Sequence, residues 1–254
     1  MNFVGRNGVL KTLYEGNKNA SAIIVFAHGF GAGKDETGNY FVDLAKALGE
    51  RFQIFRFDFF GYGESGGRQE RTNLATQADD LRDVVRFARG LPNVETVYLL
   101  AHSMGAFAAM QCRNLCISRA VFTGIPNPDV ETIRTRLAGA MRLREGGAVY
   151  FSGVSRYPRT SGVVQLIGSS FWTTLAALDP VELITGFAAE TPLTIIRPSE
   201  DEIVSGDGME RYRVIPKVRF VEMSGSHNFA GPADRTRLIE FLRGDVFSDV
   251  VTAA

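Results

Sequence analysis

A serine at position 103 has the surroundings expected of a nucleophile. Residues 101–105 read Ala-His-Ser-Met-Gly and directly follow an apolar run at 97–100. A strand that enters a sharp turn and leaves it as a helix would lift the Ser103 hydroxyl clear of a sheet edge, where a base can reach it. Because a serine hydroxyl is a weak nucleophile at neutral pH, this pattern predicts a general base and a third group that orients the base.

The three histidines of the chain are the candidates for the base. His102 adjoins Ser103 on a predicted strand, where successive side chains point to opposite faces, so we expect it not to reach the hydroxyl. His28 lies in a glycine-rich run. His227 follows an apolar strand predicted at 218–223 and opens a loop, which makes it the expected general base.

Four carboxylates compete for the role of the orienting acid. Asp201 lies a few residues beyond a strand predicted at 193–197, and we expect it to be the acid. Glu200 is the second candidate. Glu202 and Asp207 fit better as surface carboxylates on a solvated loop.

Acyl transfer also needs hydrogen-bond donors for the developing oxyanion. The backbone N–H of Met104, at a helix N-terminus just after the nucleophile, is one expected donor. The other should come from the run 28–33, His-Gly-Phe-Gly-Ala-Gly, with Phe30 the first candidate and Gly31 the second. This run lacks the Lys-Ser/Thr ending of a phosphate-binding loop and the full dinucleotide spacing.

Two further features favour structural interpretations. Asp58 begins a loop that reads Asp-Phe-Phe-Gly-Tyr-Gly-Glu-Ser, and a turn-forming aspartate is a commoner use there than a catalytic one. Cys112 and Cys116 are four residues apart on a predicted helix, a poor geometry for a disulfide and not a metal-finger spacing. We interpret them as small packed residues, and no metal site is expected.

Strand and helix patterns alternate along most of the chain, which predicts an α/β fold with a mostly parallel central sheet and helices on both faces. The rhythm is interrupted after Gly124, so we expect residues 1–124 and 188–254 to form the core and 125–187 to form a small inserted lid. Aromatic side chains gather in this insertion, and Phe151, Phe171 and Trp172 are the expected substrate-binding residues. The alternative is a peripheral helical layer packed on the core.

Composition limits the partners. The 254 residues include 28 Lys plus Arg and 28 Asp plus Glu, so nothing favours nucleic acid or an acidic membrane surface. No segment approaches the roughly 18 apolar residues needed to span a bilayer, and the start of the chain has no apolar signal core. We therefore expect a cytoplasmic protein; the sequence carries no signal for an oligomeric state.

Taken together, the chain resembles the α/β-hydrolase superfamily over nearly its whole length. The matching segments are His28-Gly29-Phe30-Gly31, Asp58-x-x-Gly61-x-Gly63-x-Ser65, His102-Ser103-Met104-Gly105, Asp201-Glu-Ile-Val and Gly225-x-His227-x-Phe229. Within the superfamily, the His-Gly-Phe-Gly run and the short insertion resemble small feruloyl/cinnamoyl-esterase-like carboxylesterases. This resemblance implies a carboxylic-ester hydrolase that uses no cofactor, with an aromatic lid over a pocket for a small-molecule acyl ester.

Two positions depart from the family pattern. Ala101 replaces the first glycine of Gly-x-Ser-x-Gly and is small enough for the turn. Arg197-Pro198 stands where the family usually has His-Gly, which could reshape the loop that holds Asp201 and bring a cation near the site.

Other functions remain open at this stage. The same triad would serve a thioesterase, an acyltransferase or a cyclising enzyme of a biosynthetic pathway, since the acyl-enzyme step is shared. A member of the superfamily that binds a ligand without catalysis is a further alternative.

Overall fold

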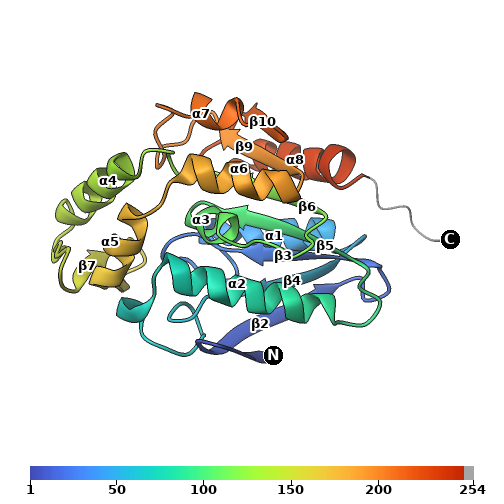
Figure 1. Cartoon of the computed structure of the whole chain (residues 1–254), viewed down its shortest axis with the longest axis horizontal. Coiled ribbons are helices and arrows are strands. Elements are labelled where there is room, and N and C mark those ends of the chain that lie inside the picture. Colours follow the sequence, from blue (N-terminus) through green and yellow to red (C-terminus); the bar gives the residue numbers. More distant parts are fainter. Residues whose placement is uncertain (249–254) are drawn as a thin grey trace.

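The computed structural model describes residues 1–248, and its centre is an eight-stranded sheet (Figure 1). The strand order is β1-β2-β4-β3-β5-β6-β9-β10, and every pairing from β4 to β10 is parallel. The β1–β2 and β2–β4 pairings are antiparallel, and β1 and β2 form a hairpin that turns at Arg6-Asn7. The strands are β1 (Asn2–Gly5), β2 (Gly8–Gly16), β3 (Ala22–Ala27), β4 (Gln53–Phe57), β5 (Thr96–His102), β6 (Arg119–Thr123), β9 (Leu193–Pro198) and β10 (Val218–Met223).

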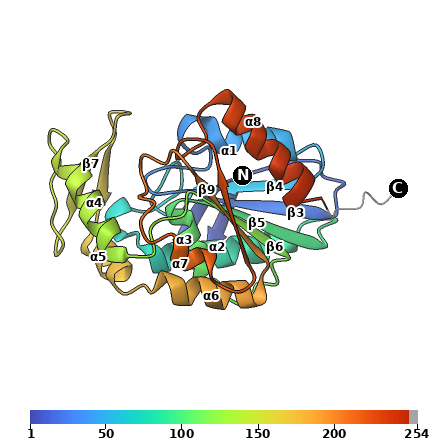
Figure 2. The ribbon, with the colours of Figure 1, turned by 90° about the horizontal axis from the view of Figure 1, so that it is seen from above.

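Helices cover both faces of the sheet, which confirms the predicted fold class (Figure 2). Strand β3 is buried along its whole length because its alternate side chains enter two separate cores. Ile23 and Val25 pack in the core that α2, α3 and α6 cover, and Ile24 and Phe26 pack in the core of α1 and α8. The core helices are α1 (Tyr40–Leu48), α2 (Leu74–Arg89), α3 (Met104–Met110), α6 (Pro180–Glu190), α7 (Glu210–Arg213) and α8 (Pro232–Phe241).

Between β6 and α6 the chain leaves the sheet and forms an inserted segment, residues 125–179. It contains α4 (Val130–Arg142), the two-stranded hairpin of β7 (Ser155–Pro158) and β8 (Val164–Ile167), and α5 (Ser169–Ala176). In Figure 2 α4 and the hairpin stand at one side of the sheet, while α5 contacts the core helix α2. The expected lid boundary at residue 187 falls inside α6, which contacts α3 and buries Ile184 and Phe187 in the core. Helix α6 therefore belongs to the layer that covers the sheet.

Three short helices complete the described chain, namely η1 (Thr37–Asn39), η2 (Gln69–Arg71) and η3 (Leu242–Val246). Both cysteines are free, Cys112 buried and Cys116 exposed. Across residues 1–248, the structure contains no helix with the length and apolar character to span a bilayer.

Candidate active site

The turn at Ser103 has the backbone of a strand-to-helix elbow. Ser103 lies between β5 and α3 with φ 50° and ψ −126°, a left-handed conformation that few side chains adopt without strain. The close approach of α3 to β3 explains Gly105, since a Cβ there would lie 2.4 Å from the carbonyl oxygen of Ala27. The sequence thus folds so that the Ser103 side chain projects at the carboxyl end of the central strands.

Asp201 and His227 come from the loops after β9 and β10 and meet beside this turn. The Nδ1 of His227 lies 2.8 Å from Oδ2 and 3.0 Å from Oδ1 of Asp201, and both side chains are almost buried. The loop that carries Asp201 is held by its own carboxylate, because Oδ1 accepts the N–H groups of Ile203 and Val204. Glu200 lies on the exposed surface and accepts instead from the Ser224 hydroxyl.

The surroundings of Asp201 favour its ionised form. Burial alone would raise the pKa of this carboxyl, but the hydrogen bond and charge of His227 and the two backbone N–H groups outweigh burial and hold the pKa below its usual value. An ionised Asp201 accepts a proton-bearing Nδ1, which leaves Nε2 of His227 as the acceptor nitrogen. His227 and Ser103 line the same cavity. The described residues include no hydrogen bond between them; such bonds often form fully only with substrate bound.

His102 lies beneath His227 rather than beside the Ser103 hydroxyl. The two imidazole rings are 4.8 Å apart, and His102 is fully buried. Its Nδ1 faces the Thr123 hydroxyl at 3.0 Å and its Nε2 faces Oδ1 of Asn228 at 3.2 Å. Because the amide oxygen of Asn228 can only accept, the proton of a neutral His102 belongs on Nε2. His102 therefore supports the His227 ring from below.

The burial of His102 predicts a pH effect on stability. Desolvation, with the nearby His227 charge second, lowers the pKa of His102 well below its ordinary value. Below about pH 6.5 the unfolded chain therefore binds a proton at this imidazole that the folded chain does not bind. The free energy of unfolding should be unaffected by His102 above about pH 6.5 and should fall as the pH drops below that value, by up to about 1.4 kcal/mol per pH unit. In urea melts between pH 7.5 and 5, His102→Asn should reduce this slope relative to the wild type. An identical slope in both proteins would contradict this assignment.

Two backbone N–H groups point to an oxyanion site. Within residues 1–248 neither the N–H of Phe30 nor that of Met104 has a hydrogen-bond acceptor. Both residues line the cavity together with Ser103. The N–H of Gly29, by contrast, is taken by the carboxylate of Glu36. This bond leaves Phe30 as the next free donor in the loop after β3.

Several residues that brace the site were not among the sequence candidates. Glu36 accepts from Gly29 and from the N–H of Thr37, and Glu202 accepts from the N–H of His227 at 3.0 Å. Glu36 has φ 57°, a conformation that no residue pattern around it signals. Glu202 was expected to be a solvated surface carboxylate, and although exposed it holds the backbone of His227 in place.

Other candidates have structural contacts that explain them. Asp58 is buried, and its carboxylate accepts the N–H groups of Lys34 and Glu64, which agrees with the turn-forming interpretation. His28 accepts from the N–H of Phe59 through Nε2 at 3.0 Å. Arg197 is paired with Glu222 at 2.6 Å and does not line the cavity. Among residues 1–248 no group of three His, Cys, Asp or Glu side chains could hold a metal ion.

Ser103 and His227 open onto a cavity of about 480 Å³, a size suited to a small organic molecule. Residues of the core and of the inserted segment both line this cavity. From the inserted segment come Thr132, Ile133, Arg136, Leu137 and Ala140 of α4, with Tyr157 and Arg159 of the hairpin. The loop after β9 contributes Glu202, Ile203, Val204 and Ser205.

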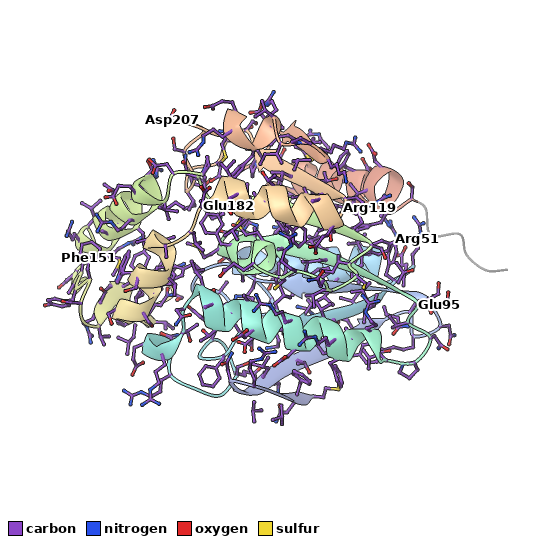
Figure 3. All side chains as sticks on the ribbon, in the orientation of Figure 1. Arg51, Glu95, Arg119, Phe151, Glu182 and Asp207 are labelled. Atoms are coloured by element: carbon purple, nitrogen blue, oxygen red, sulfur yellow. The ribbon has the colours of Figure 1, made fainter. Side chains whose placement is uncertain are left out.

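The three aromatic residues expected to bind substrate are not on this wall. Phe171 and Trp172 are buried in the same core as Ile23 and Val25, and the Phe171 ring packs on Phe30 at 4.9 Å. Phe151 is partly exposed at the outer edge of the segment, where it packs on Trp172 (Figure 3). Aromatic side chains suit both a hydrophobic core and a ligand pocket, so their clustering in the sequence does not distinguish the two. Here Phe171 and Trp172 belong to a core.

The comparisons with known proteins agree with this fold. Residues 24–240 match the model of the alpha/beta hydrolase family, and the chain belongs to that family. A Haemophilus influenzae protein named "Putative esterase/lipase" is 32% identical over 94 residues, which is 37% of this chain and 30% of that protein. The match thus spans less than a third of the length of that relative.

Solved structures share the fold over almost the whole chain. Est1E from Butyrivibrio proteoclasticus, in a structure with bound ferulic acid, aligns with a TM-score of 0.74 at 16% identity, covering 97% of this chain and 99% of that chain. The Pyrococcus furiosus esterase Pf2001 aligns with a TM-score of 0.68 at 17% identity, covering 96% and 91%.

Proposed function

We propose that this α/β hydrolase is a serine-dependent carboxylic-ester hydrolase that acts on a small-molecule acyl ester. The observation that carries the proposal is the convergence of three parts on one cavity: the Ser103 turn, the Asp201–His227 pair and two unpartnered N–H groups. An esterase-like relative and esterases among the structural neighbours support the same class.

The proposed reaction follows from these contacts. Ser103 Oγ attacks the ester carbonyl while Nε2 of His227 takes its proton, and Asp201 stabilises the resulting imidazolium. The N–H groups of Phe30 and Met104 bind the oxyanion of the tetrahedral intermediate. Protonated His227 then returns the proton to the leaving alcohol, which yields an acyl-enzyme. Water, activated by the same histidine, releases the acid and restores Ser103.

We propose the inserted segment 125–179 as the lid of this site, since residues of α4 and of the β7–β8 hairpin line the cavity together with Ser103 and His227. Substrate choice would then depend on α4 and on the hairpin. A cytoplasmic location and the absence of nucleic-acid and membrane partners stay predictions from composition.

A substrate panel tests this function. We expect p-nitrophenyl esters of graded chain length to be hydrolysed by the wild-type protein, with the corresponding acyl thioesters as slower substrates. A preference for thioesters, or for transfer of the acyl group to an added alcohol over water, would favour the thioesterase or acyltransferase alternatives. Failure of every acyl donor would contradict the proposal.

The cavity wall predicts which residues set chain-length preference. Leu137→Ala should move the optimum toward longer acyl chains, because Leu137 lines the cavity and its truncation enlarges the space for the acyl chain. Phe171→Ala should instead destabilise the protein by about 3 to 5 kcal/mol, the usual range for a buried phenylalanine. Chain-length profiles and urea melts of both variants check this expectation. A shifted optimum in Phe171→Ala at unchanged stability would contradict it.

Gly124 offers a test of how closely His227 must be placed. Its φ is +54°, and a Cβ there would lie 3.0 Å from Cε1 of His227 and 3.1 Å from Cε1 of His102. Gly124→Ala should therefore displace the His227 ring and lower kcat by roughly 10- to 100-fold, since a displacement of about 1 Å can have such an effect. Gly139→Ala on α4 is the matched control, because its Cβ would meet no atom within 4 Å. A wild-type kcat in Gly124→Ala would contradict the expectation that the position of the His227 ring limits the rate.

A further inference from the structure

The charged side chains on the cavity wall are of both signs, and the carboxylates among them are already bound. Both oxygens of Glu36 accept backbone N–H groups, from Gly29 and Thr37. Glu202 accepts from the N–H of His227. These hydrogen bonds stabilise both carboxylates and occupy both oxygens of Glu36 and one oxygen of Glu202.

The two arginines of the wall have no such partners. Arg159 follows the β7 strand and is half-buried; its guanidinium lies 4.7 Å from the centre of the Tyr157 ring. Arg136 projects from α4 and donates only to the carbonyl oxygen of Ile203, at 3.3 Å. Across residues 1–248 neither guanidinium forms an ion pair. By contrast, Arg134 on the same helix, which does not line the cavity, is paired with Glu131.

Arg159 also lies close to the proposed reaction centre. Its Cζ would be 3.2 Å from a Cβ on Gly31, the residue that follows the proposed oxyanion donor Phe30. Arg136 also lines the cavity and lies beside the loop that carries Asp201. A ligand that fills the cavity therefore meets both guanidinium groups.

The surrounding segment reinforces this positive charge. Residues 130–168 contain six arginines, two glutamates and no aspartate or lysine, although positive and negative residues balance in the whole chain. A cleft with an excess of one charge raises the local concentration of oppositely charged ligands. The cavity lining itself holds two arginines and two glutamates, so the excess of positive charge lies in the surrounding segment, where it favours the approach of anions.

We propose that the substrate carries an anionic oxygen group, a carboxylate or a phosphate, which Arg159 binds with the help of Arg136 while the ester lies at Ser103. The planar guanidinium matches the geometry of both groups and binds them through paired N–H donors. This inference rests on the proposed function and names the substrate class of the same site.

A set of matched esters tests it. The substrates are p-nitrophenyl heptanoate, which is neutral, p-nitrophenyl hemiadipate, which carries a carboxylate, and p-nitrophenyl 5-phosphonopentanoate, which carries a phosphonate as a phosphate analogue. We expect the wild-type protein to prefer at least one anionic ester over the neutral one. Arg159→Met should lower this selectivity ratio in kcat/KM by about tenfold or more, and Arg136→Met by a smaller factor. The favoured anionic ester identifies the anion.

Arg156→Met is the control for net charge, because Arg156 is an exposed residue of the same hairpin that does not line the cavity. We expect this variant to keep the wild-type selectivity ratio. Equal ratios in wild type and Arg159→Met, or equal losses in Arg156→Met and Arg159→Met, would overturn the inference. Ser103-dependent hydrolysis with no anion preference would overturn it while leaving the proposed function intact, and hydrolysis of no ester would contradict both.

Discussion

Ser103→Ala is expected to lower kcat by about 10⁴-fold or more and to leave the fold intact. Only the side-chain oxygen is lost, and among the described residues this oxygen makes no hydrogen bond that the fold would miss. The remaining rate would come from binding and from the N–H groups of Phe30 and Met104, which still stabilise an oxyanion. Steady-state rates on a short p-nitrophenyl ester, together with a thermal melt, check both parts of the expectation.

The control for this variant is Ser65→Ala. Ser65 donates its hydroxyl to the carbonyl oxygen of Asp58 in the loop after β4, away from the cavity wall. We expect the Ser65→Ala variant to be less stable than the wild type, without a loss of kcat comparable to that of Ser103→Ala. If Ser103→Ala were folded and retained more than a tenth of the wild-type kcat, another group would have to be the nucleophile.

Asp201→Asn should have the second-largest effect, a loss of about 10⁴-fold in kcat. The asparagine oxygen can still accept the N–H groups of Ile203 and Val204, so the loop should keep its conformation. Its NH₂ group would face Nδ1 of His227, which favours the tautomer with the proton on Nε2. That tautomer cannot accept the proton of Ser103. Activity should therefore fall even though asparagine has the same size and shape as aspartate.

The same substitution changes stability in a defined direction. Because the pKa of Asp201 is lowered in the folded protein, its ionised form stabilises the fold above about pH 4, and this contribution is lost as pH falls through the folded pKa. Asp201→Asn should therefore be less stable than the wild type at neutral pH, with the difference shrinking in acid. Glu200→Gln is the control, since Glu200 has no contact with His227 among the described residues; activity lost in Glu200→Gln and kept in Asp201→Asn would reverse the assignment.

The sequence could bring the three candidate triad residues together because each of them follows a predicted strand. Ser103, Asp201 and His227 come after β5, β9 and β10, which belong to one parallel sheet, so their loops share its carboxyl edge. The hydrophobic runs that define these strands are visible without a structure. Once the strands are recognised, the positions of the three loops follow from topology.

The groups that support the triad could not be predicted in this way. Glu36 and Glu202 act on backbone N–H groups of other loops, and only the tertiary fold determines which carboxylate meets which N–H. The cavity wall was missed for a related reason. Leu137 and Phe171 are both apolar residues of the insertion, and no periodicity distinguishes the side chain that faces a cavity from the one that fills a core.

The boundary of the inserted segment shows the same limit. Helix α6 follows the inserted segment without any change in composition, yet it packs on α3 and covers the sheet. An amphipathic helix has the same pattern whether it covers a sheet or a lid. Its placement depends on the loop at 177–179 that leads the chain back to the core.

The most direct test of the central claim is peptide mapping by mass spectrometry after treatment with a fluorophosphonate. Such reagents require a serine that an adjacent base activates, so we predict one adduct per chain, on the peptide that contains Ser103, and its loss in His227→Gln. Labelling of Ser65 or Ser226 in place of Ser103, or no labelling of the folded wild-type protein, would contradict the account.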